Sequence, residues 1–105
     1  MRIIKPSRVR EFCRQYPDAA AGLIKWLKDA QRAEWRSLID VRRLYASADG
    51  VKVRSGERER TATVFNIGGN KYRLIVTIHY NRQRIFVRQF LTHVEYDRGR
   101  WKVNL

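Results

Sequence analysis

The sequence is poor in cysteine and in acidic residues. Cys13 is its only cysteine, which excludes an internal disulfide bond and a cysteine-based metal cluster. The 10 acidic residues are scattered along the chain, so we expect no carboxylate cluster that could hold Mg²⁺ for phosphodiester cleavage. The two histidines, His79 and His93, lack Cys or His partners at the spacing of a zinc site. The sequence therefore predicts no metal and no other cofactor.

Long apolar runs and nucleotide-binding motifs are also missing. No segment is apolar for long enough to span a bilayer, and the charged N-terminal residues lack the apolar core of a signal peptide. We therefore expect a cytoplasmic protein with no membrane partner. Gly68 and Gly69 fit neither the GxGxxG nor the P-loop pattern. Because they precede an expected strand, they are typical of a hairpin turn.

Positive charge is what the sequence has in excess. Its 105 residues include 23 Lys and Arg and carry a net charge of +13. A chain of this length forms one domain, which we place at residues 1–105. Self-repulsion at such a charge opposes compaction, so the charge indicates a polyanionic partner. Nucleic acid is the commonest partner of this kind, although an acidic protein is equally compatible with the charge.

Helical periodicity fills the first half of the chain. Apolar residues at helical spacing predict one helix over residues 7–16 and a second over residues 19–35. The short break between them predicts a helical hairpin. Residues 1–4 are expected to form a short strand, a third helical piece is expected to start at Ser37, and residues 46–60 are expected to form a loop.

Strand periodicity fills the second half. We expect strands over residues 61–66, 72–80 and 84–91, joined by short turns and therefore paired antiparallel. Residues 92–101 are compatible with a helical turn or with an irregular segment. The predicted fold class is α+β, with the N-terminal strand and the helical hairpin packed on a mainly antiparallel sheet of three to four strands.

Period-two alternation assigns the side chains of the last two strands to two faces. The apolar face, expected to pack on the helices, comprises Tyr72, Leu74, Val76, Ile78, Tyr80, Ile85, Val87 and Leu91. The opposite face comprises Arg73, Thr77, His79, Arg84, Phe86, Arg88 and Phe90. This face suits RNA, because guanidinium groups pair with phosphates and aromatic rings stack on bases. The alternative is that the arginines only keep an exposed sheet face soluble, which is the better interpretation for any single one of them.

The polar face and the residues that follow it have the groups needed to cleave RNA without a metal. RNA can be cut by its own 2′-OH if one group accepts that proton, cations stabilise the phosphorane, and another group protonates the leaving 5′-oxygen. Arg73 and Arg88 are the candidate cations, and His93 and Tyr96 follow where the chain leaves the sheet. Imidazole is the side chain that titrates near neutral pH. For His93 a structural hydrogen bond is an equally good interpretation, and for His79 a surface position at the end of the hairpin is favoured.

Two strings in this region carry a family resemblance. FNIGGNKYRL at residues 65–74 and THVEYD at residues 92–97 resemble the HigB toxins of bacterial type II toxin–antitoxin systems, which belong to the RelE/ParE-like group. The resemblance covers nearly the whole chain apart from residues 47–60. It implies the RelE/ParE-like fold and a metal-independent mRNA interferase, an endoribonuclease that cleaves mRNA on the ribosome and inhibits translation. It also implies a cognate helix-turn-helix antitoxin, HigA-like, that neutralises the toxin.

The resemblance also implies roles for single residues. Arg73 matches the arginine of the Tyr-Arg-Leu strand motif, and His93 and Tyr96 match a C-terminal polar cluster more loosely. The predicted catalytic residues are Arg73, Arg88, His93 and Tyr96. The arginines would stabilise the phosphate, and His93 or Tyr96 would move the proton. The residues predicted to bind RNA are Asn70, Lys71, Arg84, Phe86 and Phe90.

Two other functions fit the same sequence. One fold can host both RNA cleavage and gyrase poisoning, so a gyrase-poisoning toxin of the same group is an alternative. A basic RNA-binding module without catalysis accounts for the charge and the aromatic residues equally well.

Overall fold

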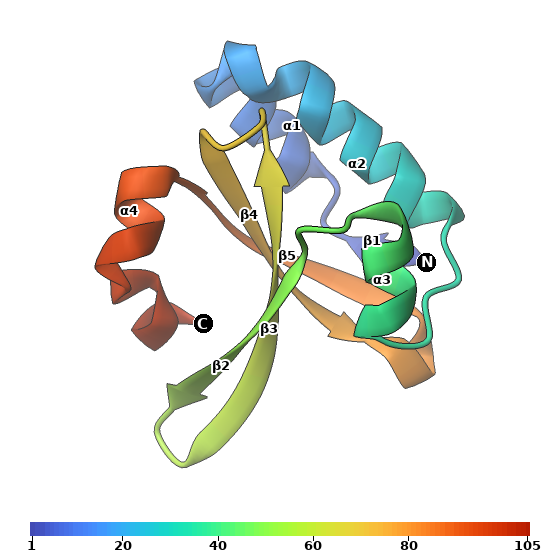
Figure 1. The fold of residues 1–105 in the computed structure, drawn as a ribbon, viewed down its shortest axis with the longest axis vertical. Coiled ribbons are helices and arrows are strands. Elements are labelled where there is room, and N and C mark those ends of the chain that lie inside the picture. Colours follow the sequence, from blue (N-terminus) through green and yellow to red (C-terminus); the bar gives the residue numbers. More distant parts are fainter.

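The chain folds as helices on one face of a sheet and a short C-terminal helix near the other (Figure 1). The computed structural model describes the backbone of residues 1–105 and the side chains of residues 1–54, 56–103 and 105. Its strands (β), α-helices (α) and 3₁₀ helices (η) are β1 (Arg2–Ile4), α1 (Ser7–Gln15), η1 (Pro17–Ala19), α2 (Ala20–Arg32), α3 (Leu38–Leu44), β2 (Asp49–Ser55), β3 (Arg58–Ile67), β4 (Tyr72–His79), η2 (Tyr80–Arg82), β5 (Arg84–Thr92), α4 (His93–Arg98) and η3 (Arg100–Asn104). The predicted α+β class is confirmed. Among the described helices, none has the length and apolar character needed to cross a bilayer.

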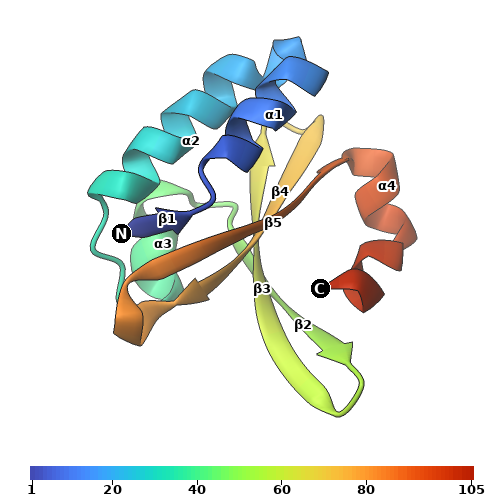
Figure 2. The same cartoon turned by 180° about the vertical axis from the view of Figure 1, so that it is seen from behind.

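The sheet has five strands in the order β1-β5-β4-β3-β2. β1 pairs in parallel with β5, with Arg2 opposite Arg84, and the other neighbours pair antiparallel. Figure 2 shows β1 beside β5, under the start of α1. The predicted N-terminal strand is therefore confirmed, and it adds an edge to the antiparallel meander.

The prediction of a loop over residues 46–60 is wrong. Residues 49–55 form β2, which pairs with β3. With this hairpin the sheet has five strands, whereas three or four were predicted. Val51 and Val53 point to the same side as Ala62 and pack with it in an apolar cluster. β2 forms because it pairs with β3, and its own period-two pattern is weak. The turn residues and charges of this segment make that pattern hard to recognise.

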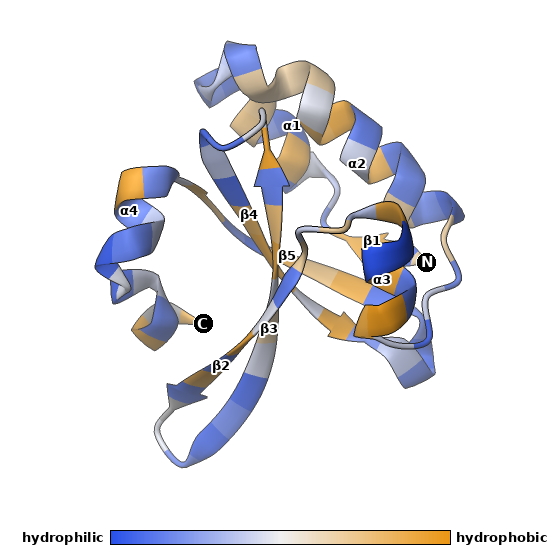
Figure 3. Ribbon diagram, in the orientation of Figure 1, coloured by the Kyte–Doolittle hydropathy of each residue, from blue (hydrophilic) through white to orange (hydrophobic). Residues whose placement is uncertain are grey.

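The main core lies between the helices and the sheet. Leu23 and Trp26 of α2 are fully buried against Phe65 of β3 and Leu74 of β4, and the Trp26 and Phe65 rings lie 5.5 Å apart edge to face. The predicted apolar side of β4 is confirmed, since its alternate residues belong to this core. Figure 3 shows apolar segments along the central strands, whereas the tip of the β2–β3 hairpin is hydrophilic.

The predicted turn at Gly68 and Gly69 is confirmed and joins β3 to β4. Both residues have left-handed backbone conformations, with φ of +66° and +68°, which glycine adopts at little cost. The turn lies close to α2, because a Cβ on Gly22 would be 3.2 Å from the Ile67 side chain. This packing holds the start of β4, where Arg73 lies, against the helical layer.

Candidate functional site

The polar side of the sheet is divided by the C-terminal segment. Trp101 of η3 is almost fully buried, and it packs against Ile75 in the middle of β4. Arg73 lies on one side of this apolar contact, and Thr77, which contacts Arg88, lies on the other side. The four residue-to-residue steps from Arg73 to Thr77 span about 13 Å of strand. The predicted catalytic set of two arginines, a histidine and a tyrosine is therefore not a single cluster.

We define the Arg73 cluster as Arg73, Asn70, His93, Tyr96 and Asp97. Arg73 as a whole residue is only 8% exposed. It donates hydrogen bonds to the backbone carbonyls of Asn70 and Tyr72, both at 3.1 Å, and to the side-chain oxygen of Asn70 at 2.8 Å. Asn70 therefore positions Arg73 directly, which sequence reasoning did not foresee. A charged group held this firmly gives a fixed positive potential at the end of β4.

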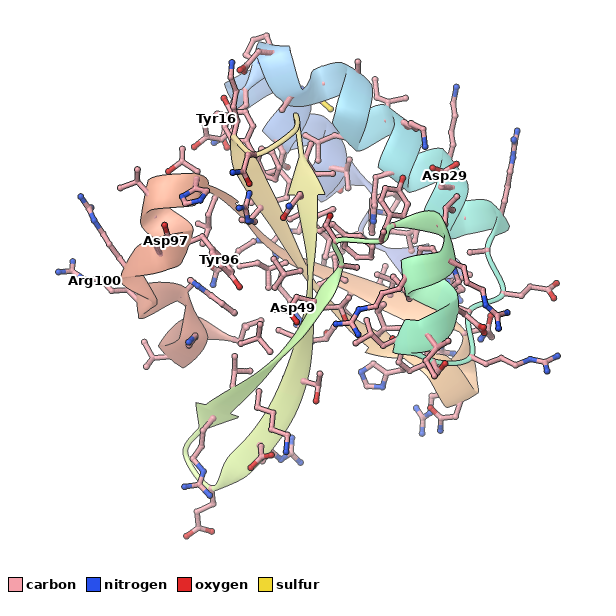
Figure 4. All side chains as sticks on the ribbon, viewed as in Figure 1. Tyr16, Asp29, Asp49, Tyr96, Asp97 and Arg100 are labelled. Carbon is pink, nitrogen blue, oxygen red and sulfur yellow. The ribbon has the colours of Figure 1, made fainter. Side chains whose placement is uncertain are left out.

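Tyr96 lies directly against that charge. The Arg73 guanidinium carbon is 5.7 Å from the centre of the Tyr96 ring, and this ring also stacks on Trp101 at 5.2 Å. Trp101 also donates its indole N–H to the Tyr96 carbonyl at 3.0 Å. Figure 4 shows Tyr96 projecting from α4 toward the sheet, on the side where Asp49 begins β2.

The hydroxyl of Tyr96 stays protonated at neutral pH. Burial raises its pKa above the ordinary tyrosine value, and the nearby carboxylates of Asp49 and Asp97 raise it further, while Arg73 opposes them. A tyrosine in this state can donate a proton but is a poor acceptor of one. Tyr96 is therefore a group beside Arg73 that carries a proton at neutral pH.

His93 begins α4 and is oriented by a carboxylate. Its Nδ1 lies 2.8 Å from an Asp97 carboxylate oxygen, one helical turn ahead, and both side chains are partly exposed. With Nδ1 at the Asp97 carboxylate, Nε2 is the ring nitrogen that Asp97 does not contact. His93 and Tyr96, three residues apart, are neighbours on the helix surface. The Asp97 partner was not predicted, although its i, i+4 spacing from His93 was a usable signal.

Hydrogen bonds at both ends of the cluster fix α4 to the sheet. Thr92 and Glu95 form a capping box, with the Thr92 hydroxyl accepting from the Glu95 N–H at 3.2 Å and the Glu95 carboxylate accepting from the Thr92 N–H at 3.0 Å. The His93 N–H donates to the Lys71 carbonyl at 2.9 Å, which ties α4 to the β3–β4 turn. The Lys71 ammonium is exposed beside the cluster and lies 3.5 Å from Asp18.

Arg88 and Phe86 lie beyond Trp101, outside the Arg73 cluster. Arg88 donates from Nε to the Thr77 hydroxyl at 3.0 Å, and its guanidinium carbon is 5.1 Å from the centre of the Phe86 ring. Arg84 is exposed at the far end of the same strand, opposite His79. These residues keep their predicted face but are separated from His93 and Tyr96.

The prediction that Phe90 lies on the basic face is wrong. Phe90 is 6% exposed and its ring contacts Phe12, Tyr16 and Tyr72 in the main core. The cause is a bulge, since Ile75 pairs with Gln89 but the next residue of β4 pairs with Val87, so that β5 carries one extra residue. Side-chain parity inverts after the bulge, and Leu91 moves from the predicted core to the polar side.

Comparisons with known proteins identify the family of this chain. Residues 19–99 match the HigB toxin family, described as the RelE-like toxic component of a toxin–antitoxin system. The mRNA interferase HigB of Escherichia coli O6:H1 is 28% identical over 98 residues, covering 93% of this chain and 90% of that protein. The mRNA interferase toxin HigB of Escherichia coli K12 and the mRNA interferase HigB of Shigella flexneri are each 23% identical over 97 residues, covering 92% of this chain and 88% of those proteins. The matched span includes the β3–β4 turn, Arg73 and α4, and the chain belongs to the HigB toxin family, the RelE-like toxic components of toxin–antitoxin systems.

Proposed function

We propose that this protein is an mRNA interferase, an endoribonuclease that cleaves mRNA at the Arg73 cluster without a metal cofactor. The relatives carry that activity in their names. The observation that carries the proposal is the convergence of three groups at one end of the sheet. These are a buried and fully oriented arginine, a protonated tyrosine against it, and a histidine held by a carboxylate.

The proposed reaction uses each group once. His93 Nε2 accepts the proton of the 2′-OH, and the 2′-oxygen forms a bond to the adjacent phosphorus. Arg73 stabilises the negative charge of the phosphorane. The bond from phosphorus to the 5′-oxygen then breaks, and the Tyr96 hydroxyl donates its proton to that oxygen. The products are a 2′,3′-cyclic phosphate and a 5′-hydroxyl end.

The exposed neighbours of the cluster supply substrate contacts in this proposal. Lys71 is close enough to the cluster, through its carbonyl bond to His93, to contact a flanking phosphate. We also propose that the substrate is mRNA engaged on the ribosome, so that cleavage inhibits translation. A family of toxic components implies a cognate antitoxin, which we propose is a helix-turn-helix protein that neutralises this activity.

The test is cleavage of mRNA by purified protein on translating ribosomes, with 5′ ends mapped by primer extension. The native protein should give discrete new ends. His93→Gln should lose at least about a hundredfold in rate, the usual contribution of a general base. The matched control is Val94→Ala, because Val94 is the exposed neighbour of His93 on α4, and this variant should cleave normally.

Two outcomes would overturn the proposal. Intact mRNA with folded native protein, together with gyrase-dependent DNA breaks in cells, would replace mRNA cleavage by gyrase poisoning. Equal cleavage by His93→Gln and Val94→Ala would be consistent with mRNA cleavage but would contradict the role of His93 as the general base.

A further inference from the structure

A second basic hollow lies on the polar side of the sheet, away from the Arg73 cluster. A groove of about 540 Å³ lies over the ends of β3 and β4, and a smaller hollow of about 230 Å³ lies over β1 and the start of α1. Both are lined by Phe86 and Arg88, so they are neighbours, and we call the two together the Arg88 groove. Five cationic side chains line it, namely Lys5, Arg8, Arg58, Arg60 and Arg88.

The positive charge of the Arg88 groove is poorly compensated within the described side chains. Its only carboxylate is Glu59, which pairs with Lys52 at 3.6 Å. Arg8 donates to the Arg88 carbonyl at 2.7 Å, which brings a second guanidinium beside Arg88. Burial lowers the pKa of Arg88, and the charges of Arg60 and Arg8 lower it further. Such mutual repulsion is relieved when a polyanion binds, and guanidinium groups match the geometry of phosphate oxygens.

The aromatic ring of Phe86 lies among these cationic side chains. Phe86 is partly exposed, with Arg88 5.1 Å from its ring centre and the His79 ring edge-on at 5.1 Å. Arg88, whose Nε donates to the Thr77 hydroxyl, lines both hollows. A half-buried ring beside fixed cations is the combination that takes single-stranded nucleic acid, since a base stacks on the ring while the phosphates meet the cations.

We propose that the Arg88 groove is a second RNA-binding site, which holds a nucleotide and its flanking phosphates from a single-stranded segment outside the cleavage site. The site lies on the same side of the sheet as the Arg73 cluster, about 13 Å away along β4, so one RNA strand reaches both. The inference rests on the proposed function, because it assigns the groove to the same substrate. The groove adds affinity and register on the RNA and takes no part in the bond-breaking step.

The test measures binding of an uncleavable RNA. A fluorescent 2′-O-methyl oligonucleotide of about 12 nucleotides is titrated at several salt concentrations with native protein, Arg60→Gln, Phe86→Ala and the control Arg32→Gln. Arg32 is an exposed arginine at the end of α2, in the helical layer, so its loss changes the net charge equally. Thermal unfolding of each variant verifies that it is folded.

The groove variants should bind more weakly than the control. Arg60→Gln should reduce the slope of log affinity against log salt by about 0.7, the value for one lost contact to a single strand. Phe86→Ala should weaken binding at least about fivefold. At saturating mRNA on ribosomes, Arg60→Gln should cleave at the native rate with a raised KM. His93→Gln should bind the oligonucleotide normally and fail to cleave mRNA on ribosomes.

Two results would overturn the proposal without touching the cleavage assignment. Equal losses in Arg60→Gln and Arg32→Gln would show that only net charge matters. Native RNA affinity in both groove variants, with lost binding of the cognate antitoxin, would make the groove a protein interface. Failure of the proposed function itself is distinguishable, because native protein would then bind the oligonucleotide but leave mRNA intact.

Discussion

Replacing Tyr96 by phenylalanine isolates the proton that the account assigns to this residue. Phenylalanine keeps the ring that stacks on Trp101 at 5.2 Å and lies under the Arg73 guanidinium at 5.7 Å. The fold should therefore be retained, with the free energy of unfolding changed by less than about 1 kcal/mol. Only the hydroxyl is lost, which in the proposed reaction donates its proton to the leaving 5′-oxygen.

The expected loss in the Tyr96→Phe variant is that of a general acid. Such groups contribute about 10²–10⁴ in rate, which corresponds to about 3–5 kcal/mol of the activation barrier. The assay is single-turnover cleavage of ribosome-engaged mRNA at saturating protein, with urea unfolding measured on the same preparation. Cleavage within threefold of native by a folded variant would refute the assignment of Tyr96 as the acid. A large loss of cleavage in a variant that is also unfolded would mean that Tyr96 contributes to packing and not to proton transfer.

Three further predictions address stability and the supports of the site. Thr92→Ala removes one half of the capping box and should lower the free energy of unfolding by about 1 kcal/mol, with slower cleavage because α4 carries Tyr96; Thr92→Ser should restore both. Phe90→Ala should lower the free energy of unfolding in urea by about 3–5 kcal/mol, as expected for a core aromatic residue. A change near zero would contradict the buried position of Phe90. Tyr45→Phe removes the 2.6 Å hydrogen bond to Asp29, which, after the bond from Lys25, holds the pKa of that carboxyl below its ordinary value. That stabilisation is present above the ordinary carboxyl pKa and is lost as the pH falls through the lowered one, so the penalty of Tyr45→Phe should shrink between pH 7 and pH 3; a constant penalty would contradict the linkage.

Local pattern predicted the elements whose residues have regular periodicity. The two long helices and the apolar side of β4 follow directly from spacing, and α2 covers Ala20–Arg32 instead of the predicted residues 19–35. Parity along β4 also placed Arg73 on the polar side, where Tyr96 meets it. These features could be predicted because each depends on one segment and one period.

Features that depend on two segments were missed. The β2–β3 hairpin exists because β2 pairs with β3 and buries Val53, although its tip is charged. The bulge at Arg88 leaves no mark in the sequence of β5, yet it exchanges the faces of Phe90 and Leu91. Trp101 splits the predicted site because it folds back over Ile75. Each of these features is set by contacts between segments, which the periodicity of a single segment does not reveal.

The central claim is that RNA is cut by its own 2′-OH under the control of the Arg73 cluster. The most direct test uses mRNA that carries a single 2′-O-methyl group on the nucleotide before a mapped cleavage position, assayed on ribosomes beside the unmodified mRNA. The account predicts that the methyl group abolishes cleavage at that position, while the unmodified mRNA yields a 2′,3′-cyclic phosphate and a 5′-hydroxyl. Cleavage of the methylated position at the native rate, or a product with a 5′-phosphate, would contradict it.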